Sequence, residues 1–534
     1  MSFEVRHSDL GGRIGKLNTA HGILDTPAFI PVVHPINQIV DVKLLKTMGF
    51  RAIITNAYIA LKHYGDNARK KGIHRIIDFD DIVMTDSGGY QVLEYGNIDI
   101  GPIEMAKFEI DIKTDIAVPL DKPTGFGLEY SKAIEYVNQT ISNVKKTVEV
   151  IKNNNSCNTN QINTIWAGPV QGAEHLDLVE GSAKLFDDMN FQLMALGSPV
   201  ELMEAYEFAK LSEIICTLKK TIPSKPIHLF GAGHPLTIPL AVALGCDMFD
   251  SASYILYAKD NRYMHSNGTT RLEEITYFPC SCSICNSYTP HELLQTTEIE
   301  RIIQLSLHNL YVLKKEVNSV KQSILDGRLW EYIMSKAHNH PKLMDAVRLF
   351  KNFDYLEDGT PIYKDKAIYF NEPYDQYRPE AKRFRKMVTK YIINNKNKLI
   401  LHPETKIHPF YASKNFIKIK ELLSDWEVFS YNPFLGIIPA EISDIFPASH
   451  NIISVENDAQ SFAANYSSFI DAMKFFLKVN QGKNIIIIAN EFMKQIIYYF
   501  RSQENINEIF NSNIKILDYK ENTIFEISSE IHNK

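Results

Sequence analysis

The sequence lacks any long uninterrupted apolar run. No stretch of its 534 residues approaches the roughly 18 consecutive apolar residues that a membrane-spanning helix needs. The first residues, MSFEVRHSDLGGRIGKL, also lack the apolar core of a secretory signal peptide. We therefore expect an intracellular, cytoplasmic protein with no membrane segment.

An excess of positive charge is also missing. The formal net charge is −6, and charged residues make up 22% of the chain. A chain of this composition is not a generally basic nucleic-acid binder, so any contact with nucleic acid must use a local patch. We find no heptad or solenoid repeat. The length predicts roughly two to four globular domains.

Cysteine is scarce, and half of it is clustered. Of six cysteines, three lie within six residues, as Cys280, Cys282 and Cys285. In a reducing compartment this spacing indicates a metal site rather than a disulfide framework. His308 would complete a closed Cys3His zinc site with a structural role, and His291 is a competing fourth ligand. The alternative is a chance group of cysteines in a loop, with His308 facing a helical core.

Short apolar runs alternate with amphipathic stretches over the first 250 residues. About eight such alternations predict a parallel sheet, and this length suits a (β/α)8 TIM barrel. A doubly wound open sheet is the alternative, but no GxGxxG turn follows the first strand. The expected strands are Thr26–Val33, Phe50–Tyr58, Ile82–Asp86, Asp115–Asp121, Asn163–Gln171, Phe191–Gly197, Pro226–Gly231 and Cys246–Asp250.

The domain organisation is expected to change near residue 362. We predict a catalytic barrel over residues 1–362, which includes a zinc module at about residues 278–310. The long segment that follows, residues 363–534, mixes shorter strands and helices and is expected to be an α+β region. Between the expected barrel strands lie helical patterns at Asp41–Met48, Leu128–Lys152, Leu176–Asp188, Pro199–Thr221 and Leu236–Leu244.

Polar residues stand at the ends of the expected barrel strands. Asp86, Asp121, Gln171, Gly197 and Asp250 each close or end such a strand. In a barrel these ends share one rim, where functional residues gather. Asp and Gly also end strands for purely structural reasons, so each position alone has an ordinary explanation. Together they predict a polar site on the carboxyl face of the barrel.

Two carboxylates on one rim suggest chemistry at a glycosidic bond. One carboxylate can attack the anomeric carbon while a second carboxyl group handles protons. Asp121 and Gln171 add an acceptor and an amide, which are the groups needed to read the edge of a heterocycle. A sugar hydrolase on the same barrel is a weaker alternative.

Taken together, these motifs resemble the tRNA-guanine transglycosylase family, most closely its archaeal branch. The resemblance covers roughly residues 1 to 350 and is weaker beyond. It rests on several motifs together: TDSGGYQ at 85–91, PLDKPT at 119–124, PVQG at 169–172, GCDMFDSASYILYAKDNRYM at 245–264 and CSCSIC…H at 280–308.

The resemblance implies base exchange in tRNA and assigns roles to the rim residues. Asp250 is similar to the nucleophile that bonds to ribose C1′, and Asp86 to the residue that contacts the base and moves protons. Asp121, Gln171 and the Gly197 backbone resemble the base-reading set, and Ser87 belongs to the loop that gives the unstacked base room. Aromatic residues Tyr90 or Tyr254 could stack on that base, or could simply pack in the core or rim.

The archaeal branch implies a particular substrate pair. Guanine 15 of the tRNA D-loop would be exchanged for 7-cyano-7-deazaguanine (preQ0), the first committed step toward archaeosine. The family also implies one structural Zn²⁺ and a homodimer. No PUA-type RNA-binding domain is evident, so a separate chain could supply it. The basic stretch Arg378–Lys398 is a candidate contact to the tRNA backbone, or else a solvated helix face.

Some positions depart from the family pattern, and two alternatives stay open. Ser-Pro-Val-Glu follows Gly197 where a more apolar segment is usual, and Phe108-Glu109 stands where a Gln-containing segment is common. One alternative is the paralogous archaeosine synthase, which has its own C-terminal signature. The segment LHPETKIHPF (residues 401–410) resembles that signature only faintly. The other is a non-catalytic RNA-binding subunit, against which the intact Asp86 and Asp250 speak.

Overall fold

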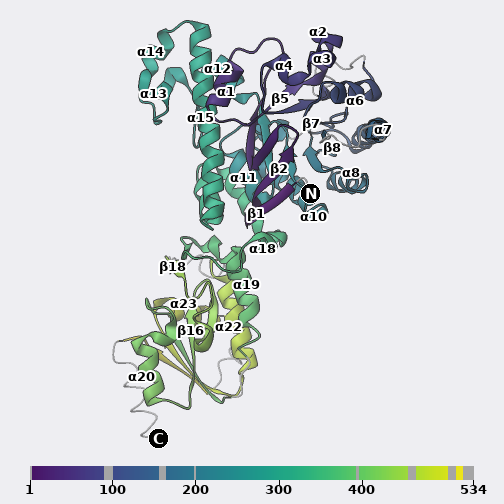
Figure 1. Cartoon of the computed structure of the whole chain (residues 1–534). Helices are drawn as coiled ribbons and strands as arrows, with labels where there is room; N and C mark the ends of the chain where they lie inside the picture. The colour runs from purple at the N-terminus through teal and green to yellow at the C-terminus, as the bar shows by residue number, and fades with distance from the viewer. Residues whose placement is uncertain are drawn as a thin grey trace. The chain divides into compact units, whose positions relative to one another are not determined.

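The chain divides into two compact units, residues 1–359 and 360–534 (Figure 1). The structure is a computed structural model that describes residues 3–89, 100–155, 164–197, 200–392, 396–454, 465–502 and 513–520. Within these ranges, no helix is both long and apolar enough to cross a membrane.

Eight parallel strands form a nearly closed barrel in the first unit. The sheet order is β4-β11-β10-β9-β8-β7-β6-β5, so neighbours in the ring follow the chain. A parallel bridge between Val32 and Ile54 joins its two ends. This confirms the predicted barrel over the doubly wound alternative. The strands are β4 (Ala28–Pro31), β5 (Ala52–Asn56), β6 (Ile82–Asp86), β7 (Ile116–Ala117), β8 (Ile165–Val170), β9 (Leu193–Leu196), β10 (Ile227–Leu229) and β11 (Met248–Ser251).

Helices follow the strands and pack outside the ring, as Figure 1 shows. The single helix expected at Pro199–Thr221 is two helices, α9 (Val200–Glu204) and α10 (Phe208–Thr221). Tyr206 between them has a φ of 56°, a left-handed conformation that an α-helix does not contain. The other barrel helices include α1 (Val42–Thr47), α2 (Ala57–Tyr64), α4 (Ile73–Ile77), α6 (Pro102–Asp111), α7 (Tyr130–Asn155), α8 (Leu176–Asp188) and α11 (Thr237–Leu244).

A three-stranded antiparallel sheet that was not predicted from the sequence precedes the barrel. It consists of β1 (Phe3–Asp9), β2 (Gly12–Thr19) and β3 (Gly22–Thr26). Phe3, Leu17 and Leu24 are buried in one cluster with inward-facing residues of the barrel strands. The small sheet therefore extends the barrel core.

Two buried aspartates tie this sheet to the amino ends of the barrel strands. Asp115, next to β7, lies 3.0 Å from His21 Nδ1 and 3.0 Å from His74 Nε2. Asp247, next to β11, accepts hydrogen bonds from Arg13 of β2 at 2.5 and 3.1 Å. These polar links lie at the end of the barrel opposite the predicted site, where residues serve stability.

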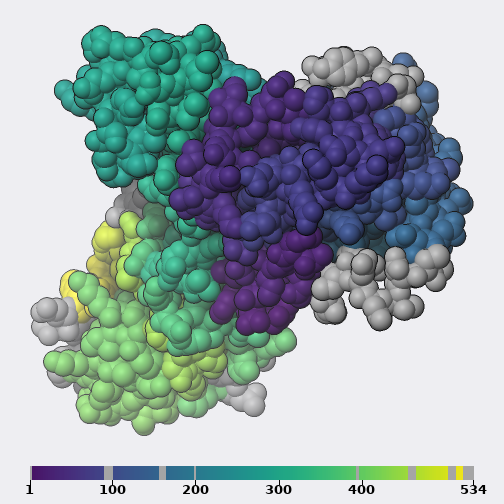
Figure 2. All heavy atoms as spheres, turned by 45° about the horizontal axis from the view of Figure 1, so that its top comes forward, coloured from purple at the N-terminus to yellow at the C-terminus, as the bar shows by residue number. Residues whose placement is uncertain are grey.

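A helical module follows the barrel within the first unit. It begins with the hairpin β12 (Arg262–His265) and β13 (Gly268–Arg271) and continues through α13 (Ser283–Ser287) and α14 (Pro290–Gln295). The long helix α15 (Glu298–Leu325) then runs back along the barrel. In Figure 1 α13 and α14 lie beside the start of α15, and Figure 2 shows this part as a projecting teal lobe.

The second unit is built on a five-stranded mixed sheet with the order β17-β16-β15-β19-β20. Leu399 and Leu401 of β15 face one apolar core, and Ile400 faces another on the opposite side. Helices therefore cover both faces. The elements are β15 (Lys398–Pro403), β16 (Glu427–Asn432), β17 (Gly436–Pro439), β19 (Asn484–Ala489), β20 (Ile514–Asp518), α19 (Pro379–Val388), α20 (Lys414–Leu422), α22 (Ser467–Val479) and α23 (Glu491–Arg501).

The basic stretch of this unit is largely engaged in internal contacts. Arg378 is fully buried and pairs with the carboxylate of Glu380 at 3.1 Å. Arg383 and Arg385 donate hydrogen bonds to backbone carbonyl groups of the same unit. These contacts favour a structural role for the three arginines. A contact of this stretch with tRNA stays a prediction.

Candidate functional site at the carboxyl rim of the barrel

The predicted polar residues meet at the carboxyl ends of the barrel strands. Asp86 is the last residue of β6, Asp250 lies within β11, and Gln171 directly follows β8. Asp121 and Gly197 follow β7 and β9. Parallel strands place these ends on one rim, and the contacts described below join the residues into a single site.

Asp250 is held by two hydrogen-bond donors. Its Oδ1 lies 2.7 Å from His228 Nε2 and 3.2 Å from the N–H of Gly231. An ionised carboxylate can only accept hydrogen bonds, so with such a group the histidine is the donor. His228 belongs to β10 and is fully buried. His228 was not among the residues predicted from the sequence, where its only signal is that it is a lone polar residue within an apolar run.

Asp86 is a carboxyl group whose environment disfavours its charge. Burial raises the pKa of Asp86 to about 6; the N–H groups of Gly88 and Ser87 oppose this shift, while the charge of Asp250 adds to it. Asn56, the last residue of β5, donates to Asp86 Oδ2 at 3.3 Å and was also missed. Near neutral pH, Asp86 can therefore both hold and release a proton.

Asp121 and Gln171 form a pair of polar side chains beside Asp86. Gln171 Nε2 donates to Asp121 Oδ2 at 2.5 Å, and Gln171 Oε1 accepts from the Thr124 N–H and hydroxyl at 3.2 Å each. These contacts fix which end of the amide faces Asp121. Burial, together with the charge of Asp86, raises the pKa of Asp121 to about 7.

Two glycines give this pair the space that it occupies. A Cβ atom on Gly197 would lie 2.2 Å from Gln171 Nε2. A Cβ atom on Gly89 would lie 2.1 Å from Asp121 Oδ1. Any side chain at either position would displace the amide or the carboxyl group, so the backbone approaches both closely because it carries no side chain.

The structure places the other residues predicted to contact the base in different environments. Ser87 is fully buried, and its hydroxyl has no hydrogen-bond partner within the described residues. Tyr254 is a core residue whose hydroxyl donates to Val32 O at 2.8 Å, so it is not available to stack on a base. Tyr90, Ser198 and Pro199 lie outside the described residues.

The three clustered cysteines and His308 come together in the helical module. Their candidate ligand atoms all lie within 4.8 Å of one another. His308 Nδ1 is 3.4 Å from the sulfur atoms of both Cys282 and Cys285. His291, the competing ligand, instead lies beside Gln295 on the exposed surface of α14. The four groups could hold a metal ion.

Neighbouring groups orient His308 for this role. Its Nε2 donates to the backbone carbonyl of Met264 at 2.8 Å, so in the neutral imidazole Nδ1 is the nitrogen with a free lone pair, and it faces the sulfur atoms. The ring of Tyr263 stacks on the imidazole at a centroid distance of 3.8 Å. Asn309, the next residue of α15, bonds to the Met264 N–H at 2.9 Å. The histidine is therefore preorganised by β12.

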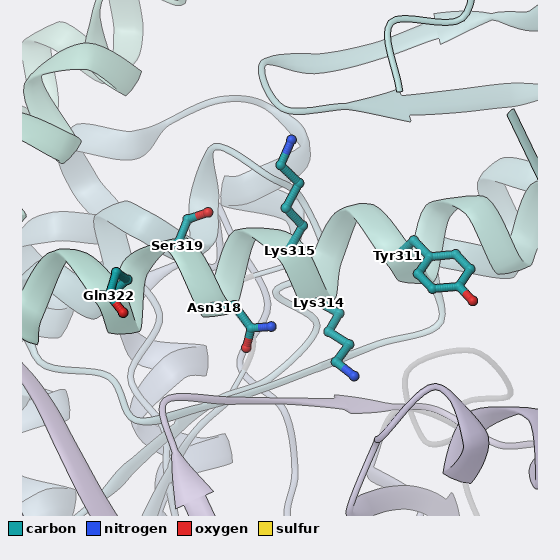
Figure 3. Close-up of a pocket in the computed structure, with 6 residues that line it drawn as sticks. All are labelled: Tyr311, Lys314, Lys315, Asn318, Ser319 and Gln322. Carbon is teal, nitrogen blue, oxygen red and sulfur yellow. The ribbon is translucent and has the colours of Figure 1, made fainter. Parts of the chain in front are cut away.

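A shallow hollow along α15 is separate from the rim (Figure 3). Lys314 donates to the carbonyl of Met48, which ties the helix to the residues that follow α1. The hollow offers no carboxylate or thiol. It is lined by Tyr311, Lys314, Lys315, Asn318, Ser319 and Gln322.

The paired rim carboxylates, one held by donors and one with a raised pKa, suit an enzyme that transfers glycosyl groups. The family model described as queuine tRNA-ribosyltransferase matches residues 9–342. The chain belongs to this family of glycosyltransferase-type enzymes. The predicted family is thereby confirmed.

Several similar proteins are named tRNA-guanine(15) transglycosylase. That of Saccharolobus solfataricus is 41% identical over 504 residues, which cover 92% of this chain and 97% of that protein. That of Sulfolobus acidocaldarius is 39% identical and covers 83% and 87%. That of Methanocaldococcus jannaschii is 36% identical and covers 97% and 78%.

Proposed function

We propose that this protein is a tRNA-guanine(15) transglycosylase. It replaces guanine 15 of tRNA by 7-cyano-7-deazaguanine in the synthesis of archaeosine. The names of the three relatives support the exchange of guanine 15. The incoming base is the one that the resemblance to the archaeal branch implies. The observation that carries the mechanism is the contrast between Asp250, held by His228 and Gly231, and Asp86, whose pKa burial raises to about 6. Carboxyl groups in such different environments take different roles.

The first displacement removes guanine. A carboxylate oxygen of Asp250 forms a bond to ribose C1′ as the bond from C1′ to guanine N9 breaks. The electron pair of the broken bond goes to the base, and neutral Asp86 supplies the proton that the base takes up. The products are neutral guanine, the Asp86 carboxylate and an ester between Asp250 and the ribose.

The second displacement inserts the new base. The Asp86 carboxylate accepts the N9 proton of 7-cyano-7-deazaguanine, and that N9 attacks C1′. The bond between C1′ and Asp250 breaks, and its electron pair restores the carboxylate. Both carboxyl groups return to their starting states, so the exchange needs no outside proton source. The phosphodiester backbone of the tRNA stays intact.

Asp121 and Gln171 read the base in this proposal. A carboxylate can accept from the ring N–H and amino groups of guanine, while the amide nitrogen of Gln171 can donate to its carbonyl oxygen. The backbone of Gly197 adds contacts at the edge of the same pair, and the buried Ser87 hydroxyl offers one more donor. A purine without the amino, ring N–H and carbonyl groups of guanine would leave the buried side chains of Asp121 and Gln171 without hydrogen bonds to the base. Such a purine would therefore be rejected.

Exchange of labelled guanine into transcribed tRNA tests the activity. We expect incorporation, and we expect 7-cyano-7-deazaguanine to displace the label. A matched tRNA with adenine at position 15 should incorporate none. Equal incorporation into both tRNAs would contradict the assigned position, and no incorporation into either by folded, zinc-loaded protein would contradict the function.

Trapping of the covalent intermediate tests the roles of the two carboxylates. Asp250→Asn should give no protein–RNA adduct on a denaturing gel. Asp86→Asn should slow overall exchange strongly, by about 100-fold or more, since general acid–base catalysis contributes on that order. An adduct with Asp250→Asn at the wild-type level would overturn the nucleophile assignment.

We also propose that Cys280, Cys282, Cys285 and His308 hold one structural Zn²⁺. The donor set is typical of closed four-coordinate zinc sites, which leave no position for a reacting water. Elemental analysis should find about one zinc per chain, lost in Cys282→Ser and kept in the neighbouring Ser281→Ala. Retention of zinc by Cys282→Ser would argue against this site.

The assembly follows from the same proposal. We expect a homodimer and a cytoplasmic location. Residues 363–534 would contribute to tRNA binding. Light scattering of the purified protein checks the dimer, and a mass near 61.0 kDa, that of one chain, would contradict it.

A further inference from the structure

Glu109 of α6 is a buried carboxyl group directly behind the rim. It is 0% exposed. Its Oε1 accepts a hydrogen bond from the hydroxyl of Thr85 at 2.9 Å, while its Oε2 is buried without a hydrogen-bond partner. No ion pair joins Glu109 to a cation within the part of the chain that the structure describes.

These surroundings favour the neutral acid. An ionised carboxylate without solvent or a cation is much less stable than its protonated form. Burial raises the pKa of Glu109 well above its usual value; the Thr85 hydroxyl opposes this shift, and the charge of Asp86 adds to it. Glu109 therefore keeps its proton under conditions in which exposed glutamates are charged.

Glu109 is linked to Asp86 in two ways. Thr85 directly precedes Asp86 in β6 and is itself fully buried, so its bond to Glu109 fixes the strand end from behind. The two carboxyl groups also interact through their charges. An ionised Glu109 would disfavour ionisation of Asp86, whereas a neutral Glu109 leaves Asp86 free to gain and lose a proton.

We propose that Glu109 is a positioning residue that acts as a neutral carboxylic acid: it anchors Thr85 and keeps negative charge away from Asp86. This inference rests on the proposed role of Asp86 in proton transfer. Gln has the shape of the neutral acid and cannot ionise. Ala removes the anchor. The two substitutions therefore separate the shape of Glu109 from its charge.

Infrared spectroscopy of the protein alone tests the protonation state. At pH 8, the difference spectrum between wild type and Glu109→Gln should show the carbonyl band of a protonated carboxylic acid. Carboxylate bands in its place would overturn the proposal. This measurement needs no tRNA, so it stands even if the wild-type protein exchanges no base and the proposed function fails.

The pH profile of base exchange tests the link to Asp86. Glu109→Gln should keep kcat within about twofold of wild type, and the limb of the profile set by ionisation of Asp86 should not move. Removal of an ionised carboxylate would instead shift that limb to lower pH, and such a shift would overturn the proposal. Glu109→Ala should lower kcat by about tenfold or more, because Thr85 loses its anchor. If Glu109→Ala does not fold, the infrared spectrum and the pH profile of Glu109→Gln still test whether Glu109 is a neutral acid.

Discussion

At the residue scale, environment gives three aspartates on one rim different properties. Asp250 accepts hydrogen bonds from His228 and from a backbone N–H. Asp86 and Asp121 are buried carboxyl groups whose pKa values rise to about 6 and about 7. One residue type can therefore serve as a nucleophile, a proton carrier and a base contact, because burial and neighbouring charge set its proton affinity.

His228 should matter for formation of the covalent intermediate. His228→Phe keeps the size of the ring but removes the hydrogen bond to Asp250. A hydrogen bond to a charged group contributes about 1.5–3 kcal/mol, so adduct formation should slow by about 10- to 100-fold. Rapid-quench measurement of the adduct checks this, with the exposed His291→Phe as control. A wild-type rate in His228→Phe would show that the contact does not position the carboxylate.

Asp121 should reduce the stability of the protein at high pH. Its folded pKa, about 7, lies above its value of 3.8 in an unfolded chain, so ionisation is harder in the folded state. The stability of wild type should fall as pH rises from about 4 to about 7. Asp121→Asn cannot ionise, so at pH 8 it should be more stable by about 2–4 kcal/mol, with little difference at pH 4.

Urea unfolding at the two pH values measures this difference. The exposed Asp188→Asn is the control, and it should show no such pH dependence. Equal stability of Asp121→Asn and wild type at pH 8 would contradict the raised pKa. The same substitution should weaken exchange of guanine, which would make Asp121 a residue that costs stability and serves function.

The sequence predicted part of the rim. Asp86, Asp121 and Gln171 each follow an apolar strand, and this local pattern is visible without a structure. Asn56 also ends an apolar strand and His228 lies within one, but their roles depend on partners 30 and 22 residues away in the chain. Contacts at that separation depend on which strands become neighbours.

At the element scale, the amino ends of the strands are held by polar links that the rim does not use. Asp115 accepts hydrogen bonds from both His21 and His74, and these residues come from β3, α4 and β7 or the turns beside them. Burial opposes the charge of Asp115, but bonds from His74, the Val83 N–H and His21 hold its pKa below the usual value.

Asp115→Asn should destabilise the barrel. A depressed pKa means that the carboxylate stabilises the fold above its unfolded pKa, and this contribution disappears as pH falls through the folded pKa. At pH 7 the substitution should cost about 3 kcal/mol or more, and the difference from wild type should shrink below about pH 3. Chemical unfolding at both pH values checks this, against the exposed Glu135→Gln. An equal loss at both pH values would show that charge is not the cause.

The elements differ in how well the sequence predicts them. All eight barrel strands are recognisable, because a strand covered on both faces is a nearly continuous apolar run. In the small sheet β1 to β3, buried and exposed residues do not alternate regularly along the strands. The two-residue period of apolar side chains that would indicate strands is therefore weak. The break between α9 and α10 depends on one residue, Tyr206, which has a left-handed backbone conformation. Tyrosine rarely adopts this conformation, so the residue type does not predict the break.

At the scale of the whole molecule, each unit has its own apolar core. The second unit packs its helices against both faces of one sheet, through two clusters of buried residues. A unit with a separate core is able to fold alone.

A fragment of residues 360–534 should therefore fold when expressed by itself. We expect a cooperative urea transition monitored by circular dichroism, with a slope that fits the burial of a unit of this size. A non-cooperative transition would contradict an independent core. Binding of tRNA by the folded fragment, measured at several salt concentrations, then checks the predicted role of this unit.

The sequence by itself determined the barrel class, the order of strand-end carboxylates, the cysteine cluster and the family. These depend on local periodicity and on motifs, which a chain carries before it folds. Tertiary structure decided that His308 rather than His291 faces the thiols, that His228 supports Asp250, and that Tyr254 is a core residue. It also decided which carboxyl groups have raised pKa values, because desolvation and neighbouring charge exist only once distant segments have packed together.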